Sequence, residues 1–117
     1  EWCNLGADTN TSNMKNNYAE VKSWNYKQQK FIGTALQFSG LIMGDHSKTA
    51  INTQFNTGTV CGVSSNIFTN GFPPNLIEHF SWGGQKHAEK FAFQKALEVA
   101  EKMMIRRNIE LKKDIWQ

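Results

Sequence analysis

The side chains of this sequence that could act as acids, bases or nucleophiles are few and widely spaced. They are the histidines His46, His79 and His87 and the cysteines Cys3 and Cys61. A neutral imidazole accepts a proton near neutral pH, which makes His46 a candidate general base for an attacking amine. The alternative is a structural histidine, which we favour because the repeat described below places His46 at a solvent-facing corner. His79 and His87 flank a Trp-Gly-Gly turn and are weaker candidates.

The two cysteines are unsuited to a metal site or a disulfide framework. Cys3 and Cys61 lie fifty-eight positions apart, without the short spacing of metal ligands, which favours a reducing compartment. Because the N-terminus lacks a basic start and an apolar stretch, we expect a cytoplasmic protein. Cys61 is expected to pack as a small apolar residue rather than to react. There is also no glycine-rich phosphate loop, so catalytic residues stay unassigned and no metal site is expected.

An amide-rich segment, Asn13-Met14-Lys15-Asn16-Asn17, combines hydrogen-bonding side chains with one cation. These groups could hold a phosphate or the amide of a ligand. A hydrated turn is the alternative, because asparagine tolerates left-handed backbone. The basic pairs Arg106-Arg107 and Lys112-Lys113 could likewise clamp phosphates, but cations are favoured at a helix C-terminus in any case. We favour a solvated helix end for these pairs.

The elements that position these residues follow from a six-residue repeat that begins at Met43. The first places of the hexads are Met43, Thr49, Phe55, Cys61 and Ile67, and the fifth places are Ser47, Thr53, Thr59 and Ser65. A period of six differs from those of helices and ordinary strands and is typical of a parallel β-helix, in which each hexad forms one flat side. We predict that first-place residues point inward, that small residues allow the chain to turn at the corners, and that three hexads close a triangular coil.

The same phase occurs once near the start, in Leu5-Gly6-Ala7-Asp8-Thr9-Asn10. Leu5 and Met43 are thirty-eight positions apart, which is not a multiple of six, so an irregular segment must separate the two stretches. We predict a loop at about residues 15–40 that leaves the coil and returns to it. A functional loop and a solvated insertion without function both remain open.

A different architecture is expected after Phe68, where the hexads stop and Gly71-Phe72-Pro73-Pro74 breaks any regular element. Apolar residues then recur at helical spacing, which predicts one amphipathic helix from about Gln85 to Arg107 that stops at Asn108. The predicted organisation is a β-helix at 1–70 with the inserted loop, then a linker and C-terminal helix at 71–117. Because about two coils are few for a stacked-repeat fold, we expect a fragment of a longer protein.

The composition excludes several kinds of protein. The 117 residues suffice for one domain, 39% of them are hydrophobic, and no apolar run is long enough to cross a membrane. Thirteen Lys and Arg residues against ten Asp and Glu residues give a net charge of +3, which is too small to indicate nucleic-acid binding. We expect a folded protein that binds neither nucleic acid nor membranes.

Two stretches resemble a family of bacterial enzymes. Cys3-Asn4-Leu5-Gly6-Ala7-Asp8-Thr9-Asn10-Thr11-Ser12-Asn13, with Ile42-Met43-Gly44-Asp45-His46 after the insertion, is similar to the C-terminal left-handed β-helix of bifunctional N-acetylglucosamine-1-phosphate uridyltransferase and glucosamine-1-phosphate N-acetyltransferase. Later segments, such as Phe80-Ser81-Trp82-Gly83-Gly84, look closer to glucose-1-phosphate thymidylyltransferase-like sugar-1-phosphate nucleotidylyltransferases. The resemblance implies an all-β fold, a left-handed parallel β-helix of hexapeptide repeats with a C-terminal α-helix, in a cytoplasmic homotrimer.

The resemblance also implies site residues. Asn4 matches an asparagine that contacts the sugar phosphate, Ala7 a backbone contact to acetyl-CoA, and Asn13 the asparagine beside the thioester. Met14 stands where the acetyltransferases have a tyrosine, and Ile51 where they have a serine. The family's catalytic histidine and basic phosphate ligands belong to coils before the position of Cys3. The site in this segment would therefore be incomplete, and the segment alone would be inactive.

Two functions follow from the resemblance. In the first, the chain is the C-terminal domain of a transferase that makes nucleotide sugars. Its substrates are a sugar phosphate with an acyl-CoA or a nucleotide, and it contributes to the trimer and to an acetyl-CoA site. Mg²⁺ would then serve a nucleotidyltransferase domain outside this segment. In the second, the chain is a non-catalytic trimerisation or regulatory domain of a nucleotidyltransferase.

Overall fold

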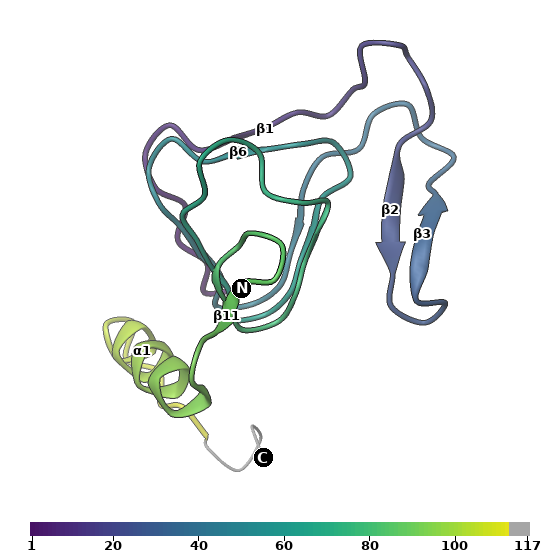
Figure 1. The fold of residues 1–117 in the computed structure, drawn as a ribbon. Helices are drawn as coiled ribbons and strands as arrows, with labels where there is room; N and C mark the ends of the chain where they lie inside the picture. Colours follow the sequence, from purple (N-terminus) through teal and green to yellow (C-terminus); the bar gives the residue numbers. More distant parts are fainter. Residues whose placement is uncertain (113–117) are drawn as a thin grey trace.

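The computed structural model describes residues 1–112 and shows a strand-rich chain with one helix near its C-terminal end (Figure 1). This agrees with the all-β expectation and the predicted C-terminal helix. The strands are β1 (Asn10–Thr11), β2 (Lys22–Asn25), β3 (Lys30–Gly33), β4 (Ile42–Met43), β5 (Lys48–Thr49), β6 (Gln54–Phe55), β7 (Val60–Cys61), β8 (Asn66–Ile67), β9 (Leu76–Ile77), β10 (Ser81–Gly83) and β11 (Glu89–Lys90), and the helix is α1 (Phe93–Ile105). Within residues 1–112, no helix is long and apolar enough to cross a membrane.

Most strands pair in parallel with a strand one circuit further along the chain. Ile42 in β4 faces Val60 in β7, and Lys48 in β5 faces Asn66 in β8, each eighteen positions on. Asn10 in β1 faces Gln54 in β6 in the same way, across the inserted segment. The backbone therefore runs in stacked, roughly triangular circuits, which we call coils (Figure 1).

The coils continue past Phe68, so the expected end of the repeat there is wrong. β7 pairs in parallel with β9, and β8 with β10, but the partners now lie sixteen positions apart. The side that contains Gly71-Phe72-Pro73-Pro74 carries no strand and accounts for the shorter coil. A coil two residues shorter shifts the phase of the hexads, which is why the sequence pattern ends one coil too early.

The helix also begins later than predicted. Residues 85–92 form a reversal and the strand β11, which pairs antiparallel with β10, and α1 starts only at Phe93. Gly83 and Gly84 have φ values of +123° and +87°, which reverse the chain at the end of the last coil. The helix ends at Ile105, and Asn108 has a φ of +59° and donates a backbone hydrogen bond to Ile105, as expected of a helix stop.

The interior of the coils is one side chain wide. Phe55, Cys61, Ile67 and Ile77 form a buried cluster, which confirms the inward direction predicted for the first three, while Met43 is only partly buried against it. The fifth-place hydroxyl groups are buried as well, and each follows a turn of the backbone. The hydroxyl groups of Thr53 and Thr59, for example, donate hydrogen bonds of 2.8 Å to the carbonyls three residues earlier. These bonds satisfy polar groups that would otherwise be costly inside the coil.

The corners are formed by the fourth residue of each hexad rather than by the small second residue. Residues at this place have φ values between +51° and +65° in every hexad of the repeat: Asp8, His46, Asn52, Gly58 and Ser64. The second-place glycines serve another purpose, because a Cβ at Gly62 would lie 2.6 Å from the backbone nitrogen of His79 in the next coil. They allow the coils to approach closely.

The inserted segment is a β-hairpin rather than a loop. β2 and β3 pair antiparallel, and the hairpin projects from one corner of the coils (Figure 1). At its base, the hydroxyl of Ser23 donates to the carbonyl of Gly58, and a Cβ at Gly58 would lie 2.3 Å from the carbonyl of Lys22. Gly58 therefore meets two demands, a left-handed corner and the close approach of the hairpin.

The helix α1 follows the last coil in the chain and packs against Trp2, just before the first coil. Ala100 and Met104 of α1 are buried with Leu111, and Trp2 and Leu97 pack against them. The ring of Trp2 lies parallel to that of His46, with centroids 6.2 Å apart. The chain that leaves the last coil thus returns to cover the side of the first.

The buried Phe55 gives a first test of the structure. Its side chain is fully buried, so Phe55→Ala should lower the free energy of unfolding by about 3–5 kcal/mol. Phe72→Ala is the matched control, because Phe72 is 59% exposed and should change stability by less than about 0.5 kcal/mol. Urea denaturation followed by circular dichroism measures both, and equal losses in the two variants would refute the inward position of Phe55.

Candidate functional site

The three residues that the resemblance assigns to ligands lie on the surface and are held through their backbones. Asn4 forms a parallel bridge with Lys48, and its carbonyl accepts a hydrogen bond from Thr49. The carbonyls of Ala7 and Asn13 accept from Asn52 and Ser39, both at 2.8 Å. All three side chains are exposed, and none of them lines the hollows described below. The structure therefore does not bring Asn4, Ala7 and Asn13 together in one cavity.

The amide-rich segment borders a surface hollow of about 520 Å³, which we call the amide hollow. Lys15, Asn16 and Asn17 contribute to it from the start of the insertion. Asn56, Thr57 and Asn75 contribute from two successive coils, and these were missed in the sequence. Because Asn56 and Asn75 lie about one coil length apart, the repeat itself was the signal that could have paired them.

The hydrogen bonds inside the amide hollow leave donors available for a ligand. The side-chain oxygens of Asn17 and Asn56 accept backbone hydrogen bonds from Ala19 and Thr57, which leaves their NH₂ groups as donors. Lys15 adds one positive charge. A ligand with carbonyl, hydroxyl or phosphate oxygens matches this set of groups.

The two departures from the acetyltransferase pattern occupy different environments. Met14 is half-buried and lines the amide hollow, where it replaces a polar group with an apolar wall. Ile51 is 66% exposed and precedes the corner residue Asn52, away from this hollow. Of the two substitutions, only Met14 lies where it changes the hollow.

His46 does not face solvent, so its predicted exposed position is wrong. The residue is 4% exposed and lies beneath Trp2. The left-handed corner of the coil is covered here by Trp2 and by Glu1, whose carbonyl accepts a hydrogen bond from the backbone N–H of His46. Burial, and then the charge of Lys48, lower the pKa of His46 from its ordinary value of 6.5, whereas Asp45 raises it. A covered imidazole that resists protonation is a poor general base for an external substrate.

The lowered pKa of His46 predicts how stability depends on pH. The unfolded chain binds a proton at its ordinary pKa of 6.5 and the folded chain only below it. Stability is therefore full above 6.5 and is lost as the pH falls toward the lower folded pKa. His46→Asn keeps a residue that tolerates left-handed backbone and should flatten this dependence, measured as urea midpoints on both sides of pH 6.5.

His87→Asn is the matched control for this measurement. His87 is exposed and has a φ of +61°, close to the +60° of His46. Both positions therefore require left-handed backbone, but only His46 is buried. This variant should keep the pH dependence of the unmodified chain. If His87→Asn flattens it and His46→Asn does not, the assignment to His46 is wrong.

The two cysteines differ in environment as their places in the repeat suggest. Cys61 is 3% exposed, and burial raises the pKa of its thiol to about 11. The sulfur of Cys3 lies 3.3 Å from the carbonyl oxygen of Gly44 and is partly exposed. A buried thiol with a raised pKa is the opposite of an activated nucleophile, so Cys61 is unsuited to that role.

Thiol labelling should separate the cysteines. With an aromatic disulfide reagent at mildly alkaline pH, Cys3 should react in the folded protein and Cys61 only after unfolding in urea, because the thiolate is the reactive form. Peptide mapping of the labelled protein identifies the modified residue. Equal labelling rates in the folded state would contradict the buried position of Cys61.

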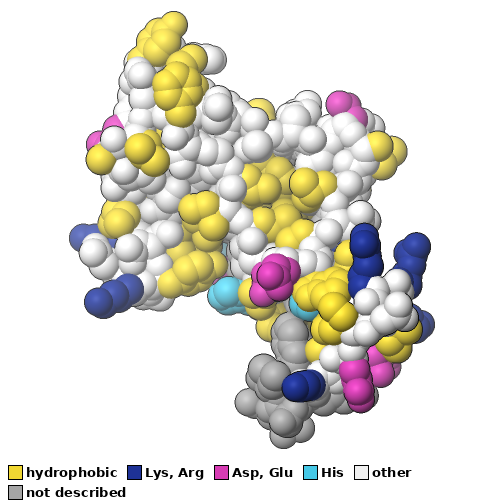
Figure 2. Space-filling model, turned by 180° about the vertical axis from the view of Figure 1, so that it is seen from behind, with side chains coloured by type: hydrophobic (Ala, Val, Ile, Leu, Met, Phe, Trp, Pro, Cys, Tyr) yellow, Lys and Arg dark blue, Asp and Glu magenta, His cyan; other side chains and the backbone are white. Residues whose placement is uncertain are grey.

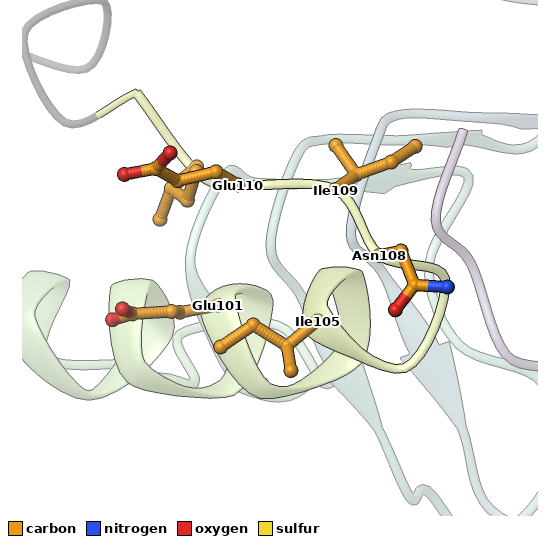
Figure 3. Close-up of a pocket in the computed structure, with 6 residues that line it drawn as sticks. Glu101, Ile105, Asn108, Ile109 and Glu110 are labelled. Carbon is orange, nitrogen blue, oxygen red and sulfur yellow. The ribbon is translucent and has the colours of Figure 1, made fainter.

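A groove also lies at the C-terminal end of α1. The chain turns back at Asn108 and runs beside the helix, which leaves a groove of about 220 Å³ (Figure 3). Glu101 and Glu110 line it together with Ile105 and Ile109. Arg106, Arg107 and Lys112 are exposed near the helix end, as the solvated alternative requires, and Lys113 lies outside the described residues. The groove itself carries carboxylates, which does not favour the alternative of a phosphate clamp at this helix end.

Metal chemistry has no support among the described residues. Within residues 1–112, no group of three or more His, Cys, Asp or Glu side chains is placed to hold a metal ion. Comparisons with protein-family models and with curated proteins give no match. What the chain does must therefore be inferred from its repeat and from the geometry of its hollows.

Proposed function

We propose that the coils form a left-handed parallel β-helix of hexapeptide repeats and that the chain is the C-terminal domain of a cytoplasmic sugar-1-phosphate nucleotidylyltransferase or acetyltransferase. Support comes from the eighteen-residue parallel register and from the left-handed corner at every sixth residue. The buried first-place and fifth-place residues agree with the same architecture. The domain would assemble as a homotrimer and contribute to a site for acetyl-CoA and a sugar phosphate. Mg²⁺ would serve a nucleotidyltransferase domain outside this segment.

The observation that carries the acyl-CoA proposal is the amide hollow beside Asn13. Ser12 and Met14, the two neighbours of Asn13, both line it. Acetyl-CoA would supply an acyl thioester, and its pantetheine chain contains amides that pair with asparagine side chains. Asn16 and Asn17 would hold those amides, and Lys15 would hold a phosphate. Met14 lies against the apolar links of such a chain.

The separation of Asn4 and Ala7 from this hollow favours a site shared between subunits. Both belong to the first coil, whereas the hollow lies at the start of the insertion and against later coils. A neighbouring subunit that packs on the coil side would place a second set of residues there. A sugar phosphate at Asn4 and a thioester at Asn13 would then come from different chains.

A second candidate function is assembly without catalysis. It is favoured by the burial of His46, which leaves this segment without an accessible general base at that position, and by the apolar residues Met14 and Ile51. In this case the chain serves as a non-catalytic trimerisation or regulatory domain. The two functions share the fold and differ in whether acetyl-CoA binds.

Calorimetry on the full-length protein separates the two functions. Acetyl-CoA should bind, and Asn13→Ala should weaken binding by about 1–3 kcal/mol, because the resemblance places the side chain of Asn13 beside the thioester, where it would donate a hydrogen bond. Gln94→Ala, at an exposed position of α1, is the control and should bind as tightly as the unmodified protein. No heat at millimolar acetyl-CoA would remove the acyltransferase proposal and leave assembly as the function.

The homotrimer is tested by light scattering at micromolar concentration. Large apolar side chains remain exposed on the coil sides, among them Leu5, Ile42, Ile51, Phe68 and Trp82. Hydrophobic side chains also gather in the middle of the rear face of the molecule (Figure 2). Such surface usually marks an interface, so the expected mass is three times that of the chain. A stable monomer would contradict the proposed assembly.

A further inference from the structure

A second hollow lies where the tip of the hairpin, the last coil and the segment after β10 meet. It has a volume of about 350 Å³, is more enclosed than the amide hollow, and is called the cap hollow here. Phe31 of β3 and Leu76 of β9 line it, as do Lys86 and His87 on the reversal that closes the coil. Its size falls at the lower end of the range for small-molecule sites.

The charges around the cap hollow favour an anion. Lys90 donates hydrogen bonds of 3.0 Å to a carboxylate oxygen of Glu78 and to the carbonyl of His79, so the one carboxylate that lines the hollow is already paired. In the part of the chain that the structure describes, Lys86 makes no ion pair. The hollow therefore has a net positive charge, and partial enclosure strengthens its attraction for a negative group. The imidazole of His87 adds a further hydrogen-bonding group.

The cap hollow also has an apolar wall. The ring of Phe31 is 43% exposed and is held by an edge-to-face contact with Trp24, with centroids 5.1 Å apart. Pro74 and Leu76 continue this wall. Aromatic and apolar side chains of this kind stack on planar heterocycles. Ser81 and Gln85 supply polar groups at the edge of the hollow.

From these two walls we propose that the cap hollow binds a nucleoside monophosphate, with the base against Phe31 and Pro74 and the phosphate at Lys86. A ligand with a flat ring at one end and an anion at the other fits both walls, whereas an inorganic anion uses only one. This site is separate from the amide hollow, with which it shares Asn75 but none of the amide donors at the start of the insertion. The inference goes beyond acyl transfer and stands whether or not acetyl-CoA binds.

The hairpin is part of this site. Tyr26 stacks on His79 with ring centroids 5.3 Å apart, and the backbone N–H of Val63 donates to the same imidazole. These contacts fix the hairpin against the last two coils, and they hold Phe31 over the hollow. The sequence leaves the role of the insertion open, and the proposed site would give it a function in binding.

Calorimetry with AMP and UMP tests the proposal on the full chain. Both should bind, and adenosine or inorganic phosphate alone should bind at least about tenfold more weakly, because each occupies one wall only. Lys86→Gln should weaken AMP binding by about tenfold through loss of a charge-assisted hydrogen bond. Phe31→Leu keeps an apolar side chain but removes the flat ring, and should weaken AMP more than inorganic phosphate.

Two control variants make the outcome decisive. Lys95→Gln removes the same charge from an exposed position on α1, outside the hollow, and should leave AMP binding unchanged. Asn16→Ala alters only the amide hollow and should also leave it unchanged, so failure of the acyl-CoA proposal stays distinguishable from failure of this one. The proposal is overturned if millimolar AMP gives no heat, if phosphate binds as tightly as AMP, or if Lys95→Gln weakens binding as much as Lys86→Gln.

Discussion

Left-handed backbone at one residue in six is the constraint on which this structure depends. For a residue other than glycine this conformation costs roughly 1–2 kcal/mol, and the chain accepts it at Asp8, His46, Asn52 and Ser64. Each such corner ends one two-residue strand and redirects the backbone, so that the next strand meets the coil beside it. The cost is offset by hydrogen bonds between coils, such as those from Gly44 to Cys61 and from Ala50 to Ile67, both at 2.8 Å.

The corner geometry also determines what the interior can contain. A strand of two residues directs only one side chain into the coil. The core is therefore built from one inward side chain per strand, with Phe55, Cys61 and Ile67 at its centre. The fifth-place hydroxyl follows each corner and is buried, which explains why serine and threonine recur there and larger polar residues do not. Close stacking of the coils then requires glycine where backbone meets backbone, as at Gly62.

Much of the regular part of this fold could be predicted from the sequence, and the irregular parts could not. The six-residue period placed Phe55, Cys61 and Ile67 inside because the phase repeats without error across those hexads. The period failed after Phe68 because the last coil is two residues shorter. The start of α1 was predicted too early because β11 occupies residues that were assigned to the helix. His46 was placed in solvent because Trp2, which covers it, lies outside the repeat.

The candidate sites, too, depend on the irregular segments rather than on the repeat, and the reason is physical. A stack of triangular coils has flat sides, and flat sides offer no cavity in which a small molecule loses most of its contact with water. The amide hollow and the cap hollow both arise where another segment lies against a side of the coils: the insertion at the amide hollow, and the hairpin with the 85–90 reversal at the cap hollow. Asn75 borders both hollows because the shortened coil brings the two additions to the same corner. The repeat therefore supplies the rigid wall of each site, while the residues that would distinguish one ligand from another, such as Lys15, Phe31 and Lys86, belong to segments without any period.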